Sequence, residues 1–398
     1  MSGMRQDGIR EHGRLTNWLS DHRAALLVYV VVVVAYVILY VATIRSRPLY
    51  VPDSQYYFGM SLWYGGMSQE DAHAAVVELT RAARLFDGEY RGPSLDQMFN
   101  WGLVQPRVVL PLLAAPLVKA FGVAGIAVVT FCAGLALFLL LTRLIATRYG
   151  LGVAFATVML TISSTFILYF SVAMTTEGIS ALCNAGLVVL AWRYQRSPSR
   201  WVLVAMVAVV VVSAFTRQAT LIGAGAFAVA YLAAVFTSTR GRDWLAPAVA
   251  VVATSLAVQL LQSVAFPSFS QLDQFVEQSG GDTLLDALLG IPATVRHVLV
   301  GDFNSAAVYD HALIVLVLVS LVSLVLRWRR TESHLLLGAI LGIALYNITN
   351  GSSTSFRYAL PGLVFFTLAV AALMNDVTSW AQSRVRERQQ ESGTPTSA

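Results

Sequence analysis

The chain has 398 residues, of which 57% are hydrophobic and 12% are charged, and its mean hydropathy is +0.66. Because soluble domains carry about a quarter charged residues, this composition excludes a soluble globular domain and predicts a polytopic membrane protein. The formal net charge of +5 comes from short loops and tails rather than from a basic patch with interleaved aromatic residues, so we expect no nucleic-acid partner.

The first apolar run, residues 24–44, follows a basic tail, residues 1–23. It is about 21 residues long, which is enough to cross a bilayer, and no small-residue cleavage site follows it. We therefore expect a retained transmembrane helix. The later apolar runs are residues 123–142, 150–170, 179–192, 201–215, 220–236, 244–266, 312–326, 335–348 and 358–374.

A further run, residues 108–121, is only about 14 residues long, and prolines interrupt its helical hydrogen bonding. If this run does not cross, and residues 1–23 are cytoplasmic, every short basic loop falls on the cytoplasmic side, as the positive-inside bias requires. We therefore interpret it as a re-entrant or juxtamembrane helix. The fold expected is an all-α, polytopic membrane helix bundle of about ten transmembrane helices in one domain, residues 24–374.

This topology places the outer loops at residues 45–107 and 267–311, and the tail, residues 375–398, in the cytoplasm with the N-terminus. The expected location is the inner (plasma) membrane of a bacterium, multi-pass, with the functional face outside. Within the first outer loop, Ser68 and Asp71 have the spacing of a capping box. The apolar residues that follow share one helical face and predict an amphipathic helix lying on the membrane or on the bundle: Ala72, Val76, Leu79, Ala83 and Phe86.

Four charged residues from distant segments fall on the outer face in this topology: Asp53, Glu177, Arg217 and Arg357. Charges at the hydrocarbon edge are costly, so each is expected to have a partner or a function. Together they suggest phosphate binding combined with acid–base chemistry; alternatively, they pair with one another as structural salt bridges. The aromatic residues near Asp53, including Tyr56 and Tyr57, are interpreted either as an interfacial belt or as surfaces that stack on sugars.

Histidine contributes little to the prediction. His297 and His311 are on the outer side, but neither has the spacing of a metal ligand, so we predict no metal site built from histidine.

This layout resembles the GT-C superfamily of integral-membrane glycosyltransferases, which use polyprenyl-phosphate-linked sugars. Asp53 resembles the acidic residue that opens the family's first outer loop, and Glu177 resembles its second outer acidic position. The other similar segments are Gln105-Pro106-Arg107 before the second span, Phe215-Thr216-Arg217 at the sixth span, and Arg357-Tyr358 in the late-helix motif. The chain departs from the family in having Ser54 after Asp53 and no Asp-x-Asp.

The resemblance implies an inverting transfer of a sugar from a polyprenyl-phosphate donor to a glycan, lipid or protein hydroxyl on the outer face. The roles it implies are catalytic for Asp53 and Glu177, donor phosphate-binding for Arg107, Arg217 and Arg357, and substrate-lining for Tyr56, Tyr57, Tyr358 and His311. It implies no organic cofactor and leaves a divalent cation such as Mg²⁺ or Mn²⁺ open. Two other functions stay open: a transporter or lipid flippase, and an outer-face ligase or acyltransferase.

Overall fold

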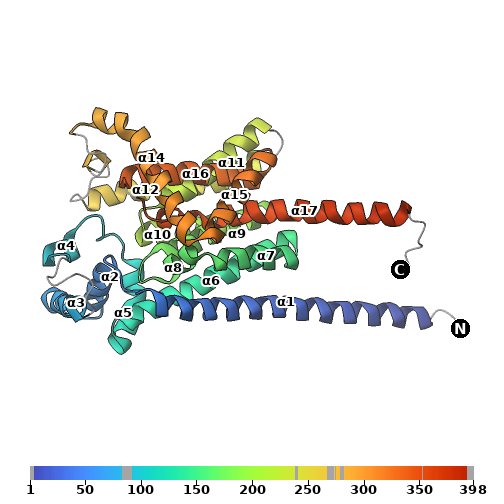
Figure 1. The fold of residues 1–398 in the computed structure, drawn as a ribbon, viewed down its shortest axis with the longest axis horizontal. Coiled ribbons are helices and arrows are strands. Elements are labelled where there is room, and N and C mark those ends of the chain that lie inside the picture. The colour runs from blue at the N-terminus through green and yellow to red at the C-terminus, as the bar shows by residue number, and fades with distance from the viewer. Residues whose placement is uncertain are drawn as a thin grey trace.

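The computed structural model describes residues 4–82, 92–237, 241–266, 273, 275–277, 282–351 and 353–391. These residues form helices and connecting turns, with no strand among them. The expected all-α, multi-pass membrane bundle is therefore confirmed at this level. Both chain ends lie at one end of the bundle, and the short helices within residues 54–100 lie at the opposite end, called here the distal end (Figure 1).

Long helices run along the bundle, and shorter ones cap its distal end (Figure 1). In chain order they are α1 (Met4–Ser46), α2 (Ser54–Tyr64), α3 (Gln69–Ala82), α4 (Leu95–Asn100), α5 (Val109–Phe121), α6 (Ala124–Tyr149), α7 (Leu151–Ser163), α8 (Thr165–Val172), α9 (Glu177–Arg196), α10 (Arg200–Thr216), α11 (Thr220–Thr237), α12 (Gly241–Ala265), α14 (Leu284–Tyr309), α15 (His311–Leu326), α16 (Thr331–Asn350), η1 (Arg357–Gly362) and α17 (Leu363–Glu391).

The number of spans differs from the ten expected. Within the described residues, six helices are long and apolar enough to cross a membrane, or seven if one bent pair counts as a single span. Four other apolar helices are shorter, at 10–17 residues: α5, α10, α15 and the apolar part of α11, Thr220–Phe236. The expectation counted α9, α10, α11 and α15 as full spans from the sequence pattern, and α5 as a juxtamembrane helix; α9 is not among the six either.

The expected single span over residues 150–170 is broken at Ser164, where α7 and α8 meet at 78°. The Ser164 hydroxyl accepts the backbone N–H of Ile167 and so caps α8. It also donates to Asp310 over 2.7 Å, and the same carboxylate accepts the backbone N–H of Phe166 at 2.8 Å and of Leu313 at 3.0 Å. One buried aspartate thus fixes the starts of both α8 and α15.

The first outer loop is helical, as predicted for part of its length. Ser68 accepts the backbone N–H of Asp71 and donates its hydroxyl to the same residue's carboxylate, which confirms the cap at the start of α3. Ala72 and Val76 are fully buried and pack in a cluster with α2 and α4. The apolar face of α3 is therefore turned to its neighbouring helices. Ala83 and Phe86 lie outside the described residues.

The expected outer loop, residues 267–311, contains a long helix, which corrects its interpretation as an irregular loop. α14 spans Leu284–Tyr309 and is one of the six helices that qualify as spans by length and composition. Charged residues such as Asp286 and Arg296 dilute the hydrophobic pattern of α14, so the apolar segments found in the sequence did not include it.

The centre of the bundle depends on close backbone packing between α11 and α16. A Cβ added to Gly338 would collide with the backbone of Gly225, and one added to Gly342 would lie 2.5 Å from the carbonyl oxygen of Leu221. Small residues allow helices in membranes to approach this closely. At the end nearer the termini, Arg148 forms a salt bridge with Glu332 at 2.6 Å. These contacts fix the helices whose other ends carry the candidate site.

Candidate functional site

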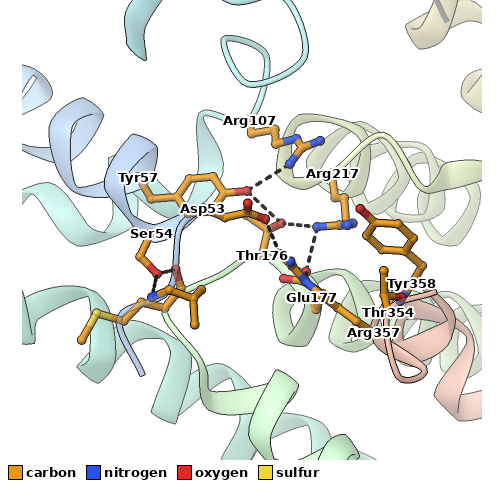
Figure 2. A network of polar contacts seen from close by, with 12 residues as sticks. Asp53, Ser54, Tyr57, Arg107, Thr176, Glu177, Arg217, Thr354, Arg357 and Tyr358 are labelled. Atoms are coloured by element: carbon orange, nitrogen blue, oxygen red, sulfur yellow. Dashed lines mark hydrogen bonds and ion pairs between the residues drawn. The ribbon is translucent and has the colours of Figure 1, made fainter. Parts of the chain in front are cut away.

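A buried carboxylate, Glu177, is the centre of a charged cluster at the distal end. It is the first residue of α9 and its side chain is completely buried. Oε1 accepts hydrogen bonds from Nη1 of Arg217 at 2.9 Å and from Nε of Arg357 (Figure 2). Position at a helix N-terminus also favours a negative charge there. One carboxylate oxygen therefore holds two arginines from different parts of the chain.

Asp53 completes the ionic contacts from the other side. It directly precedes α2 but makes no side-chain capping hydrogen bond there. Its carboxylate instead pairs with Nη2 of Arg357. The side chain of Asp53 is 37% exposed, compared with 17% for Arg357 and none for Glu177. Arg357 thus bridges an accessible carboxylate and an inaccessible one.

Arg107 is a third arginine of the cluster, and it has a different environment. It is 6% exposed and donates from Nη1 to the hydroxyl of Tyr57 at 3.2 Å (Figure 2). That hydroxyl also lies 3.5 Å from the hydroxyl of Thr176. Among the described residues, no carboxylate pairs with Arg107, and its buried Nε has no hydrogen-bond acceptor. Buried arginines are normally paired, so this group requires an explanation.

Two tyrosines surround the guanidinium of Arg217. Its Nε donates to the hydroxyl of Tyr346 at 3.1 Å, and its Cζ lies 5.0 Å from the ring centre of Tyr358. The two rings themselves meet edge-on, 5.3 Å apart. A guanidinium over an aromatic face is stabilised by the ring quadrupole. Arg217 is therefore held by an acid, a hydroxyl and an aromatic face.

The cluster carries a net positive charge, since three arginines face two carboxylates. Burial alone would raise the pKa of Glu177, but the charges of Arg217 and Arg357 outweigh burial and lower this pKa to about 2. Burial and the nearby charge of Asp53 raise the pKa of Tyr56 to about 12, so its phenol stays protonated. The carboxylate of Glu177 is therefore ionised near neutral pH, and three arginines set against two acidic residues leave one formal positive charge uncompensated.

The structure brings together most of the residues that the sequence singled out. Asp53, Glu177, Arg107, Arg217 and Arg357 form the cluster. Tyr57 and Tyr358 contact it directly, and the ring of Tyr56, 5.7 Å from that of Trp101, lies beside it.

His311 is the exception among the candidate residues. It is exposed at the first residue of α15, and the hydrogen bonds and ion pairs described for the cluster include none to it. The adjacent Asp310 contacts α8 instead.

Two contacting residues were not predicted. Thr176 and Tyr346 carry hydroxyls that reach Arg217, at 3.5 and 3.1 Å. Thr176 is next to Glu177, and Tyr346 lies near the end of an apolar run, where interfacial tyrosines are common. The sequence therefore provided no reason to distinguish Thr176 from an ordinary loop residue or Tyr346 from an ordinary interfacial tyrosine.

The chemistry of this cluster suits an anion more than a metal ion. Within the described part of the chain, no group of three or more histidine, cysteine, aspartate or glutamate side chains could hold a metal. The two carboxylates of the cluster are both engaged by Arg357. Three guanidinium groups, one of them with an unused buried donor, are the kind of group that binds phosphate or carboxylate.

Comparisons of the chain with protein-family models, with curated proteins and with solved structures find no match.

Proposed function

We propose that the protein is a glycosyltransferase that moves a sugar from a polyprenyl-phosphate donor to an acceptor hydroxyl at the distal end of the bundle. The observation that carries the proposal is the buried, carboxylate-free Arg107 beside the paired arginines Arg217 and Arg357. Burying an uncompensated guanidinium costs several kcal/mol by order of magnitude, which a bound anion would offset. The phosphate of a lipid-linked sugar lies at the membrane surface, at the depth of a helix-end cluster.

In this proposal Asp53 is the general base. Its carboxylate is the accessible one of the two, and a phosphate that binds Arg357 competes with it for the same guanidinium. Once released, Asp53 takes the proton of the acceptor hydroxyl, and the acceptor oxygen bonds to the anomeric carbon. The bond from that carbon to the phosphate oxygen breaks, and the phosphate leaves with the bonding electrons. Attack from the face opposite the phosphate inverts the anomeric centre.

Glu177 has a different task in the same scheme. It is completely buried and fixes Arg217 and Arg357. A preorganised pair of donors stabilises the charge that develops on the leaving phosphate without having to reorganise. Glu177 therefore acts as a positioning residue for the arginines, and Tyr57 does the same for Arg107.

The proposal includes an orientation: the distal end faces outward and both tails are cytoplasmic. Two observations support it. Both chain ends lie at the same end of the bundle (Figure 1). The arginines in the last turns of α6 and α9, including Arg148 and Arg193, lie at the ends of those helices that point away from the cluster.

The test is sugar transfer in proteoliposomes that contain the purified protein, supplied with radiolabelled polyprenyl-phosphate sugars and a membrane extract as the source of acceptor. Arg107→Gln is compared with Arg81→Gln, which removes an exposed arginine of α3. We expect Arg107→Gln to lower transfer by about 10²–10³-fold, the usual effect of removing one oxyanion donor.

The same variant provides a check on folding. Because Arg107 has no carboxylate partner within the described part of the chain, its loss breaks no ion pair there, and we expect the melting temperature of Arg107→Gln to equal or exceed that of the wild type. Full transfer by this variant would exclude Arg107 from donor binding. If the sugar lipid were instead moved intact across the bilayer, with no product formed, the flippase alternative would replace the proposal.

A further inference from the structure

A partly open apolar cavity of about 300 Å³ lies beside the charged cluster, between α14, α15, α16, η1 and α17. Of the residues that line it, Asp302 and Asn347 are polar and the others are aliphatic or aromatic. Apolar cavities of this kind stay dry and take up apolar ligands. Neither the fold nor the proposed chemistry at the cluster uses this space.

The cavity opens through residues that a bilayer would contact. Leu318 and Leu321 of α15 line it and are 53% and 39% exposed, and Leu299 and Phe303 of α14 line it at 64% and 59% exposure. α15 is an apolar helix whose outward side chains are leucines and valines. With these side chains turned to the hydrocarbon of a bilayer, a lipid chain could pass between α14 and α15 without crossing water.

One short segment connects the cavity with the charged cluster. Phe356 lines the cavity, and the next residue, Arg357, pairs with Asp53 and Glu177. Ser355 and Phe356 both have left-handed backbone conformations, with φ of 55° and 70°, which non-glycine residues adopt at a cost.

Asp302 of α14 stabilises that strained segment. Its Oδ1 accepts the hydroxyl of Ser353 at 2.7 Å and the backbone N–H groups of Thr354 and Ser355, each at 2.8 Å. The strained turn therefore sends Phe356 to an apolar space and Arg357 to an anion-binding cluster. A ligand with a hydrocarbon chain directly joined to an anionic head would match both sides of this turn.

We propose that the cavity binds the part of the donor's polyprenyl chain nearest its phosphate. This inference rests on the proposed function and adds where the lipid lies: the chain enters between α14 and α15, and the phosphate emerges beside Phe356 to meet the arginines. Chain binding then places the phosphate at the cluster by covalent connection, which reduces the entropic cost of orienting the head.

The test uses a polyprenyl phosphate without a sugar that carries a photoactivatable diazirine in the isoprene units next to the phosphate. The full-length protein in lipid nanodiscs is irradiated with this probe, and the labelled peptides are identified by mass spectrometry. The expected labels lie on α14, α15 and η1, and they disappear in the presence of excess unlabelled polyprenyl phosphate but not of inorganic phosphate.

A pair of variants on one helix makes the test specific. Val317→Trp fills the cavity, whereas Val315→Trp places the same ring on an exposed position of α15 that does not line it. The ring in Val317→Trp displaces about two methylene groups of the lipid chain from contact with the cavity, which corresponds to about a tenfold loss of labelling. Val315→Trp is expected to show no loss of labelling. If Val317→Trp does not fold, the positions of the labels in the wild-type protein alone test whether the chain lies in the cavity.

The outcomes separate this inference from the proposed transfer reaction. Labels confined to other surfaces, or labelling that Val317→Trp leaves unchanged, would overturn the chain site even if sugar transfer is observed. Labelling in the cavity without transfer of any sugar would reject the glycosyltransferase and retain the site as one for the polyprenyl phosphate chain. Because the probe contains no sugar, its binding does not depend on the reaction.

Discussion

The carboxylate of Asp53 and the guanidinium of Arg357, 304 positions apart in the chain, form an ion pair at the distal end. The same guanidinium donates to Glu177. The accessible acid is therefore held by a group that the proposed donor phosphate also needs. In the proposed mechanism, donor binding and release of the base are one event, which orders the reaction with the donor first.

Asp53→Asn is expected to have opposite effects on binding and on transfer. An amide cannot act as the base, so sugar transfer should be lost. Arg357 no longer has a competing carboxylate, so polyprenyl phosphate should bind more tightly, by about two- to fivefold, since exposed ion pairs are worth about 0.2–1 kcal/mol. Binding is measured by tryptophan fluorescence in nanodiscs. Asp96→Asn, an exposed acid of α4, serves as the control. Weaker donor binding in Asp53→Asn would contradict competition for Arg357.

Glu177→Gln should strongly destabilise the fold. It leaves Arg217 buried without its counter-charge, and breaking one side of a buried pair costs about 3–5 kcal/mol. Glu332→Gln is the matched control, because its partner Arg148 is 36% exposed and water can solvate it. The measurement is the melting temperature in detergent by circular dichroism. An equal drop in melting temperature in Glu177→Gln and Glu332→Gln would show that burial of the ion pair does not determine how much stability its loss costs.

The stability of the protein should depend on Glu177 in a defined pH range. Its pKa is about 2 in the folded protein, below the ordinary 4.5, because the two arginines stabilise the carboxylate. The folded state therefore binds this proton less readily than the unfolded state, and the stabilisation is complete above about pH 4.5 and is lost as the pH falls towards 2. The measurement compares melting temperatures of wild type and Glu177→Gln across this range. Curves that stay parallel below pH 4.5 would contradict the prediction.

Gly338→Ala should destabilise the centre of the bundle. The added methyl would collide with the backbone of Gly225, so α11 and α16 would have to separate, at a cost of about 1–3 kcal/mol. Gly186→Ala is the control: its added methyl meets no atom within 4 Å, and alanine favours helix by about 1 kcal/mol over glycine. Thermal unfolding of both variants in the same detergent checks the prediction, which fails if Gly338→Ala melts at the wild-type temperature.

Hydropathy and charge placement predicted much of the arrangement from the sequence. The apolar runs locate most of the long helices, and the rule that basic loops stay on one side places Asp53, Glu177, Arg217 and Arg357 at the same end. Because the four residues lie at the same end of the bundle, they can be close to one another. Helix packing determines which acid pairs with which arginine, and the sequence did not predict whether these residues pair at all. In the structure both carboxylates pair with arginines, as expected from the alternative interpretation that these residues form structural salt bridges.

Other features lay beyond local patterns. The bend at Ser164 depends on Asp310, which is 146 positions away, so no window over residues 150–170 contains its cause. α14 has a weaker apolar signal because polar residues that serve tertiary contacts, such as Asp302, interrupt it. The absence of a carboxylate partner for Arg107 among the described residues is likewise a result of helix packing. The adjacent residues Pro106 and Val108 do not indicate where acidic side chains from other segments will lie.

The order in which the cluster's charged residues leave the ribosome has a consequence for membrane insertion. From the N-terminus they are Asp53, Arg107, Glu177, Arg217 and Arg357, alternating in sign until the last. The running charge of these five residues therefore never exceeds one unit of either sign while the helices insert. Glu177 can pair with Arg217 once α9 and α10 have been synthesised, well before Arg357 is added to the chain. The surplus positive charge of the five residues appears only with Arg357, at the start of η1, so the proposed anion site would form only after the preceding helices have been made.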